Sequence, residues 1–208
     1  MTTPDLKIAA LLSSRLCHDL ISPVGAICNG LEVLKDEADA DMRAHAMSLI
    51  EASAEQASAR LQFARIAFGA AGSAGAEIEM GDALALTQNI LPRGKVALEW
   101  RLTNKMVPKD MVKLLLNLIL IAIDCIPRGG TLTVTGDLPG GQPYEVQAKG
   151  TKAKLGPDVK TALFDGVQLD ACDSRQIQPI FTKMIAEMLK VQLRAEEGGE
   201  TVLLRAAS

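Results

Sequence analysis

Apolar side chains recur at helical spacing through the first 34 residues of the chain. At about 100° per residue, the members of this stripe fall within a band of roughly 80° on a helix: Leu6, Leu16, Leu20, Val24, Ile27, Leu31 and Leu34. A stripe this narrow predicts one long amphipathic helix with a buried apolar face. The helix is expected to begin after Thr3, Pro4 and Asp5 and to end in the charged turn 35–39.

A second helical pattern runs from about Asp41 to Phe68, and its alanines permit close approach to a neighbouring helix. Two amphipathic helices joined by a short turn predict an antiparallel helical hairpin. One hairpin leaves much of its apolar surface in water, whereas two hairpins from two chains close a four-helix bundle. We therefore expect residues 1–70 to form the hairpin, and the protein to be a homodimer held by a dimeric four-helix bundle.

The pattern changes after the predicted hairpin. Residues 71–76 are small and flexible, which is typical of a linker, and residues 77–208 mix helical and strand patterns. Helices are expected near 81–91, 108–126 and 178–190, and strands near 96–100, 131–135, 144–148, 191–195 and 201–205. The predicted class is α+β, with a C-terminal α/β sandwich in which a mostly antiparallel sheet carries helices on one face.

Composition narrows the classes of function. The 208 residues carry 22 Lys and Arg against 25 Asp and Glu, and so lack the dense basic face that nucleic-acid binding requires. Two histidines cannot build a three-imidazole metal site, and the four separated cysteines include no CxxC pair. The N-terminus has no apolar leader, and Asn117 and Asp124 interrupt the longest apolar run. We expect a cytoplasmic protein with no metal site of its own and no nucleic-acid or membrane partner.

His18 falls on the side of the first helix opposite the apolar stripe. Its neighbours on that side are mostly small, which leaves the imidazole open to a large approaching body: Leu11, Ser14, Ser22, Gly25 and Asn29. Most exposed histidines are simply solvated, but the next five residues point to chemistry. Among them, Pro23 costs a helix on the order of 3 kcal/mol and frees the carbonyl of Asp19.

The run His18-Asp19-Leu20-Ile21-Ser22-Pro23 resembles the phosphoacceptor motif of sensor histidine kinases, H-[DE]-L-x-[ST]-P, on the first helix of a dimerisation hairpin. A metal-dependent HD phosphohydrolase is the competing interpretation of the His-Asp pair, but it needs further histidines and only His45 remains. A nucleophile pair of Cys17 and His18 is also disfavoured, because adjacent helical side chains diverge by about 100°.

The C-terminal part resembles a degenerate histidine kinase ATP-binding domain. Residues 117–134 resemble the asparagine box and the P-x-G-G segment after it, with Ile121 where active kinases place a Mg²⁺-binding asparagine. Ala148-Lys149-Gly150-Thr151-Lys152 replaces the adenine-binding D-x-G-x-G, and Ser174-Arg175-Gln176-Ile177-Gln178-Pro179 replaces the glycine-rich phosphate loop. Such a domain is not expected to bind ATP.

An intact phosphoacceptor helix joined to a degenerate ATP-binding-like domain is similar to the ChpT family of dimeric histidine phosphotransferases in alphaproteobacterial phosphorelays. The resemblance implies that His18 takes a phosphoryl group from the receiver aspartate of a CckA-like hybrid histidine kinase. It also implies that His18 passes the group to response regulators similar to CtrA and CpdR, in cell-cycle regulation. Mg²⁺ is expected on the partner receiver, so that this chain needs no cofactor of its own.

Positions on the helix suggest roles around His18. Asp19 is within reach of a ring nitrogen, and Ser22, one turn on, is within reach of phosphoryl oxygens, so we include both in the catalytic set. A receiver is expected to dock on the exposed hairpin through these residues: Arg15, Ile21, Gly25, Cys28, Asn29, Phe63 and Ile66. Two alternatives stay open, namely a non-catalytic dimeric scaffold and a kinase with an unorthodox nucleotide site.

Overall fold

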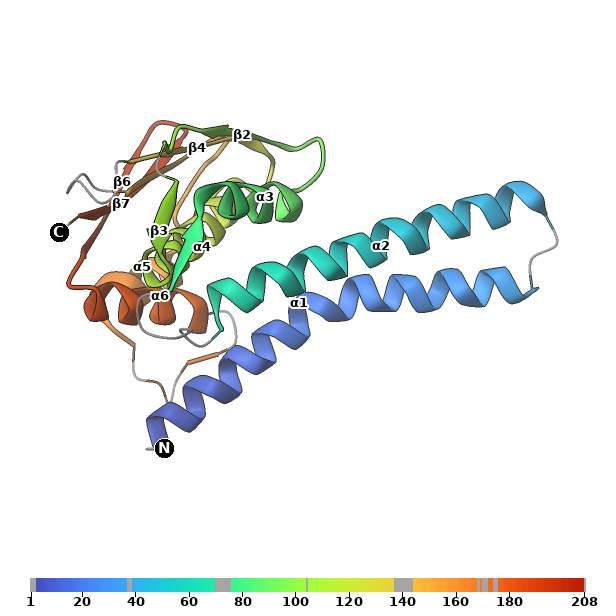
Figure 1. Cartoon of the computed structure of the whole chain (residues 1–208), viewed down its shortest axis with the longest axis horizontal. Helices are drawn as coiled ribbons and strands as arrows, with labels where there is room; N and C mark the ends of the chain where they lie inside the picture. The colour runs from blue at the N-terminus through green and yellow to red at the C-terminus, as the bar shows by residue number, and fades with distance from the viewer. Residues whose placement is uncertain are drawn as a thin grey trace.

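The computed structural model describes residues 3–36, 39–69, 76–103, 105–136, 144–167, 169, 172–173 and 176–207. Two long helices, α1 (Thr3–Asp36) and α2 (Ala40–Ala67), form an antiparallel hairpin that extends away from the rest of the chain (Figure 1). The predicted hairpin is therefore confirmed. The predicted linker, residues 71–76, lies outside the described residues except for Ala76.

Local hydrogen bonds fix the turn between the two helices. The side chain of Asp39 caps α2 by accepting from the backbone N–H groups of Asp41 at 2.9 Å and Met42 at 3.0 Å. Arg43 then donates from Nη1 to the backbone carbonyl of Leu34 at 2.6 Å. Because this bond ties the first turn of α2 to the last turn of α1, the two helices run back along each other.

The C-terminal part is built on a five-stranded sheet. Its strands lie in the order β2 (Val96–Trp100), β4 (Gly130–Thr135), β5 (Tyr144–Lys149), β7 (Thr201–Ala207) and β6 (Gln192–Gly198). Every neighbouring pair is antiparallel except β2 and β4, which are parallel. A parallel pair needs a crossover connection, and the chain between these two strands contains a long helix that supplies it.

Helices cover one face of this sheet (Figure 1). They are α3 (Met80–Ile90), α4 (Lys109–Asp124) and α6 (Ile177–Met188). The crossover helix α4 is buried along its whole middle, from Val112 to Ile119, because the sheet and the other helices surround it. Strands β4 and β5 alternate between core and outer face, as the sequence predicts for strands covered on one side.

The short elements are not predicted by the sequence. They are β1 (Glu77–Glu79), which pairs with β3 (Met106–Pro108), and the helical turns α5 (Pro157–Lys160) and η1 (Thr161–Asp165). Segments of three to five residues are too short to show a hydrophobic period, so no pattern indicates them. In the described part of the chain, no helix combines the length and the apolar character needed to cross a lipid bilayer.

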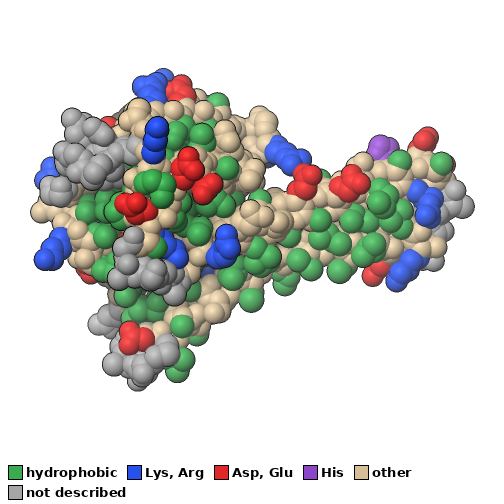
Figure 2. All heavy atoms as spheres, in the orientation of Figure 1, with side chains coloured by type: hydrophobic (Ala, Val, Ile, Leu, Met, Phe, Trp, Pro, Cys, Tyr) green, Lys and Arg blue, Asp and Glu red, His purple; other side chains and the backbone are tan. Residues whose placement is uncertain are grey.

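The apolar stripe of α1 is not buried within one chain. Val24 is 48% exposed and Leu31 is 47% exposed, Leu6 is also exposed, and the other members of the stripe are half-buried. This agrees with the expectation that one hairpin leaves much of its apolar surface in water, because α1 packs mainly against one helix, α2, which covers only part of the stripe. Figure 2 shows the resulting hydrophobic side chains gathered along the hairpin.

A buried polar network joins the end of α2 to the helical layer. Asn117 of α4 donates from Nδ2 to the carbonyls of Ala67 at 2.8 Å and Lys113 at 2.9 Å. Gln178 of α6 donates from Nε2 to the Asn117 side-chain oxygen at 3.1 Å and to the Asn117 carbonyl at 2.9 Å. Both side chains are buried. Because a buried polar group without a partner is costly, these bonds hold the last residue of the hairpin in one position.

Replacing Asn117 by Ala is expected to lower the free energy of unfolding by about 2–4 kcal/mol, because it leaves the Ala67 carbonyl and the Gln178 amide buried with fewer partners. Urea unfolding measures the change. The matched control is Asn89→Ala, at an exposed position on α3, which is expected to change the free energy by no more than about 0.5 kcal/mol. Equal effects of the two substitutions would contradict the role of the network.

Candidate functional site

His18 lies in the middle of α1 with its side chain 70% exposed. Its Nδ1 atom is 3.3 Å from Oδ1 of Asp19. An ionised carboxylate can only accept hydrogen bonds, so this contact is a hydrogen bond when Nδ1 carries the ring proton. In that neutral form Nε2 keeps its lone pair, and it is the ring nitrogen free to react with an approaching group.

Asp19 is held at two points. Its Oδ2 atom accepts a hydrogen bond from Nε of Arg15, one turn earlier on α1, at 3.1 Å. Its backbone carbonyl accepts from Nη1 of Arg60 on α2. That carbonyl lacks its usual helical partner because Pro23, four residues later, has no N–H to donate. The helix continues through the proline and bends partway along its length (Figure 1), as a proline inside a helix predicts.

A cleft of about 210 Å³ lies beside Asp19 where the hairpin meets the C-terminal helices. Its polar lining consists of Arg15, Asp19, Arg60 and Asp124, the last residue of α4. Asp124 is exposed, and the pKa of its carboxyl is raised, chiefly because the surrounding protein partly removes the carboxyl from water. The Arg15 charge acts in the opposite direction, and the Asp19 carboxylate adds to the rise.

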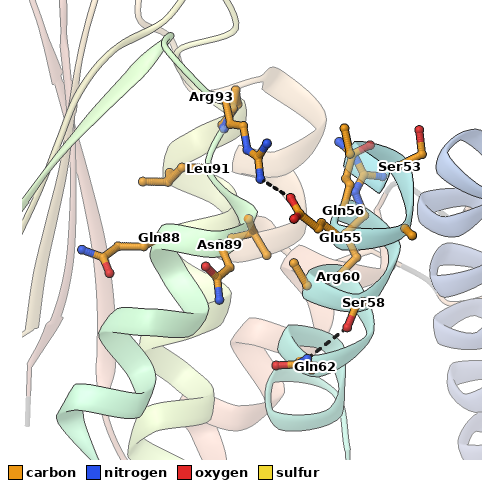
Figure 3. A pocket seen from close by; sticks show the side chains of 15 residues that line it. Ser53, Glu55, Gln56, Ser58, Arg60, Gln62, Gln88, Asn89, Leu91 and Arg93 are labelled. Atoms are coloured by element: carbon orange, nitrogen blue, oxygen red, sulfur yellow. Dashed lines mark hydrogen bonds and ion pairs between the residues drawn. The ribbon is translucent and has the colours of Figure 1, made fainter. Parts of the chain in front are cut away.

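A larger groove, of about 1030 Å³, runs between α2 and the end of α3 (Figure 3). The ion pair between Arg93 and Glu55, at 2.7 Å, crosses it, and much of the remaining lining consists of amide and hydroxyl side chains. Arg60 lines both this groove and the cleft, whereas His18 and Asp19 do not line the groove. The groove therefore lies next to the cleft beside Asp19 but does not include His18.

Five of the predicted site residues lie on the exposed part of α1. Ser22, Ile21, Cys28 and Asn29 are exposed, and Gly25 is half-buried. A Cβ atom added at Gly25 would meet no other atom within 4 Å, so this position opens onto free space. A partner approaching His18 thus meets small or polar side chains and one large apolar side chain, Ile21.

The structure corrects the prediction for the two docking residues on α2. Phe63 is 3% exposed and belongs to the hydrophobic core, so the prediction that it is presented to a partner is wrong. Ile66 is half-buried and packs against the same core. The physical reason is that α2 turns this face toward α3 and α4, which cover it.

The sequence does not single out Arg60 or Asp124. Asp124 interrupts an apolar run, which signals only that a polar side chain leaves the core at that point. Arg60 is 41 positions from Asp19 in the sequence, and only the packing of α2 on α1 brings the two together. No local pattern indicates such a contact.

Several residues at the positions that resemble nucleotide-binding boxes belong to the interior of the fold. Ile121 and Ala148 are buried in the core, and both polar atoms of the Asn117 side chain take part in the network described above. Ser174 and Arg175 lie outside the described residues. Among the residues that the structure does describe, no three His, Cys, Asp or Glu side chains are grouped so that they could hold a metal ion.

Known proteins resemble this chain in sequence and in fold. Residues 80–201 match the model of the histidine phosphotransferase C-terminal domain family. The chain is 41% identical to protein phosphotransferase ChpT of Brucella abortus (strain 2308), over 99% of this chain and 98% of that protein. It is also similar to the solved structure of a bacterial phosphotransferase, with a TM-score of 0.84, 38% identity, and coverage of 99% of this chain and 97% of that one.

Replacing Asp124 by Asn is expected to stabilise the protein at pH 7. The pKa of Asp124 is higher in the folded state, so the folded protein favours the protonated carboxyl. This stabilisation is fully present below the unfolded-state pKa of about 3.9, and it is lost as the pH rises through the folded-state pKa. The increase in the free energy of unfolding caused by Asp124→Asn should therefore appear in urea unfolding at pH 7 and become smaller toward pH 4. Asp158→Asn, at an exposed position on α5, is the control. A gain that is absent at pH 7 would contradict the expectation.

Proposed function

We propose, since this chain belongs to the ChpT family of histidine phosphotransferases, that it carries phosphoryl groups between proteins on His18. The proposed donor is the aspartyl phosphate in the receiver domain of a CckA-like hybrid kinase. The proposed acceptors are aspartates of response regulators similar to CtrA and CpdR, and the proposed location is the cytoplasm. The observation that carries the proposal is the imidazole itself, which is exposed on a helix with a carboxylate at one ring nitrogen and, among the described residues, no hydrogen-bond partner at the other.

The proposed reaction needs one well-placed nucleophile. The lone pair of His18 Nε2 attacks phosphorus, the N–P bond forms, and the bond from phosphorus to the receiver's carboxylate oxygen breaks. The ring proton stays on Nδ1, where Asp19 Oδ1 offsets the positive charge of the phosphorylated imidazole. Ser22, exposed one turn on, is proposed to donate to a phosphoryl oxygen. The reverse sequence delivers the group to the next aspartate.

The phosphoryl group is proposed to come from a protein and not from ATP bound to this chain. The transition state of phosphoryl transfer is loose, so catalysis consists mainly of positioning and charge neutralisation. We propose that the partner receiver supplies the Mg²⁺ that neutralises the charge. The burial of Ile121 and the hydrogen bonding of Asn117 support this assignment, because neither side chain offers a free oxygen to a cation.

Uptake of label tests the proposal directly. The unchanged protein is expected to gain acid-labile label from a phosphorylated receiver domain and none from labelled ATP alone. His18→Gln is expected to lower this uptake by more than about 100-fold, because it removes the reacting nitrogen. His45→Gln, at an exposed position on α2, is the matched control and should keep the uptake.

Either of two results would contradict the proposal. Label taken from ATP alone would indicate a kinase with an unorthodox nucleotide site. A folded protein that takes label from neither donor would indicate a scaffold without phosphotransfer activity.

We also propose that the chain acts as a homodimer. Large hydrophobic side chains remain exposed along the hairpin: Leu6, Ile21, Val24, Leu31, Val33, Met42, Met47, Leu49 and Leu61. A large number of exposed apolar side chains on one hairpin is unusual on a monomer. The hairpin of a second copy would cover many of these side chains and close a four-helix bundle.

Leu31→Asp is expected to weaken the proposed dimer, because it places a charge in the apolar contact. The dissociation constant measured by analytical ultracentrifugation should rise by at least about 10-fold. Met188→Asp, at an exposed position at the end of α6, is the control and should leave it unchanged. Sedimentation of the unchanged protein as a monomer at micromolar concentration would contradict the proposal.

A further inference from the structure

The backbone carbonyl of Asp19 has no hydrogen-bond donor within α1. In an uninterrupted helix it would accept from the N–H of the residue at position 23, but that residue is Pro23. Arg60 donates to this carbonyl from the neighbouring helix. The proline therefore creates an acceptor at the residue directly after His18, and α2 provides the donor that occupies it.

The carboxylate of Asp19 is held from the other direction. Nε of Arg15 donates to Oδ2, which leaves Oδ1 to accept from His18 Nδ1. The side chain of Arg15 is only 19% exposed, and Arg15 lines the cleft between the hairpin and the C-terminal helices. An arginine engaged in this way is poorly placed to meet a partner protein, in contrast to the docking role that the sequence suggests.

We propose that Arg60 and Arg15 are positioning residues for phosphoryl transfer: Arg60 fixes the backbone of Asp19, Arg15 fixes its carboxylate, and together they keep the ring proton of His18 on Nδ1 so that Nε2 is the nucleophile. This inference rests on the proposed function. It goes further by assigning a role to two residues that contact Asp19 and do not contact His18 itself, one of them on α2.

Both hydrogen bonds to Asp19 are needed to keep one tautomer of His18. A surface aspartate is free to rotate its side chain toward water, and the ring of an exposed histidine is then free to take its proton on either nitrogen. When the proton is on Nε2, that nitrogen has no lone pair to attack phosphorus. Fixing both the backbone and the carboxylate of Asp19 removes this unreactive form without placing any group in the path of the receiver.

The first test measures the ring itself. In ¹⁵N NMR spectra at a pH where the ring is neutral, His18 of the unchanged protein should carry its proton mainly on Nδ1. Arg15→Ala should shift the proton toward Nε2, whereas Arg101→Ala, which removes an equal charge from an exposed ion pair with Glu99, should not. This measurement needs no phosphoryl donor, so it is independent of whether the proposed function is correct.

The second test separates positioning from docking. At saturating phosphorylated receiver, Arg15→Ala should lower the rate constant for uptake by about 10- to 100-fold, with little change in the receiver concentration at half-saturation. Arg15→Lys keeps the charge but cannot place a donor where Nε lies, so it should also be slow. Full activity of Arg15→Lys, or an effect confined to the half-saturation concentration, would overturn the assignment of Arg15.

The third test uses the proline. Arg60→Ala should slow uptake by about 10-fold or more in the otherwise unchanged protein. In a Pro23→Ala background the same substitution should matter much less, because the N–H of the new alanine can satisfy the Asp19 carbonyl within the helix. Thermal melts confirm that each variant is folded. Equal effects of Arg60→Ala in both backgrounds would overturn the assignment of Arg60, whereas absence of uptake by the unchanged protein would instead contradict the proposed function.

Discussion

The hydrogen bond from Arg60 to the carbonyl of Asp19 connects the main features of the site. A proline within a helix leaves a carbonyl without a partner, and here that carbonyl belongs to the residue beside His18. By satisfying it from α2, the chain keeps α1 helical through the proline and fixes the register of the two helices at the level of the imidazole. The backbone next to the exposed histidine is thus fixed by α1 itself and by a hydrogen bond from α2.

The C-terminal part holds the end of α2 in place through buried hydrogen bonds. The Asn117 side chain joins the last residue of α2 to α4, and Gln178 extends the network to α6, so polar groups at positions that resemble a nucleotide-binding box act as internal structural bonds. The same packing places Asp124 in the cleft with Arg15 and Arg60. The sheet and its helices therefore determine how the base of the hairpin is held, and they contribute charge close to Asp19.

Much of the fold follows from the sequence, and the limits are physical. Long periodic segments predict α1, α2 and α4, short alternating or β-branched segments predict the five strands of the main sheet, and helical phase predicts that His18 faces solvent. The burial of Phe63 does not follow, because periodicity identifies an apolar face but does not say which element covers it. The contact of Arg60 cannot be predicted for a related reason, since its partner is a backbone atom far away in the sequence. Pro23 is the local signal that the Asp19 carbonyl needs another donor, but the sequence does not say which one.

In the proposed relay, Nε2 of His18 carries the phosphoryl group while Nδ1 keeps the proton. The most direct measurement is to identify the phosphorylated nitrogen by ³¹P and ¹⁵N NMR after transfer from a phosphorylated receiver. The expected result is a single species with phosphorus bonded to Nε2 of His18. Phosphorus on Nδ1, or on a residue other than His18, would contradict it.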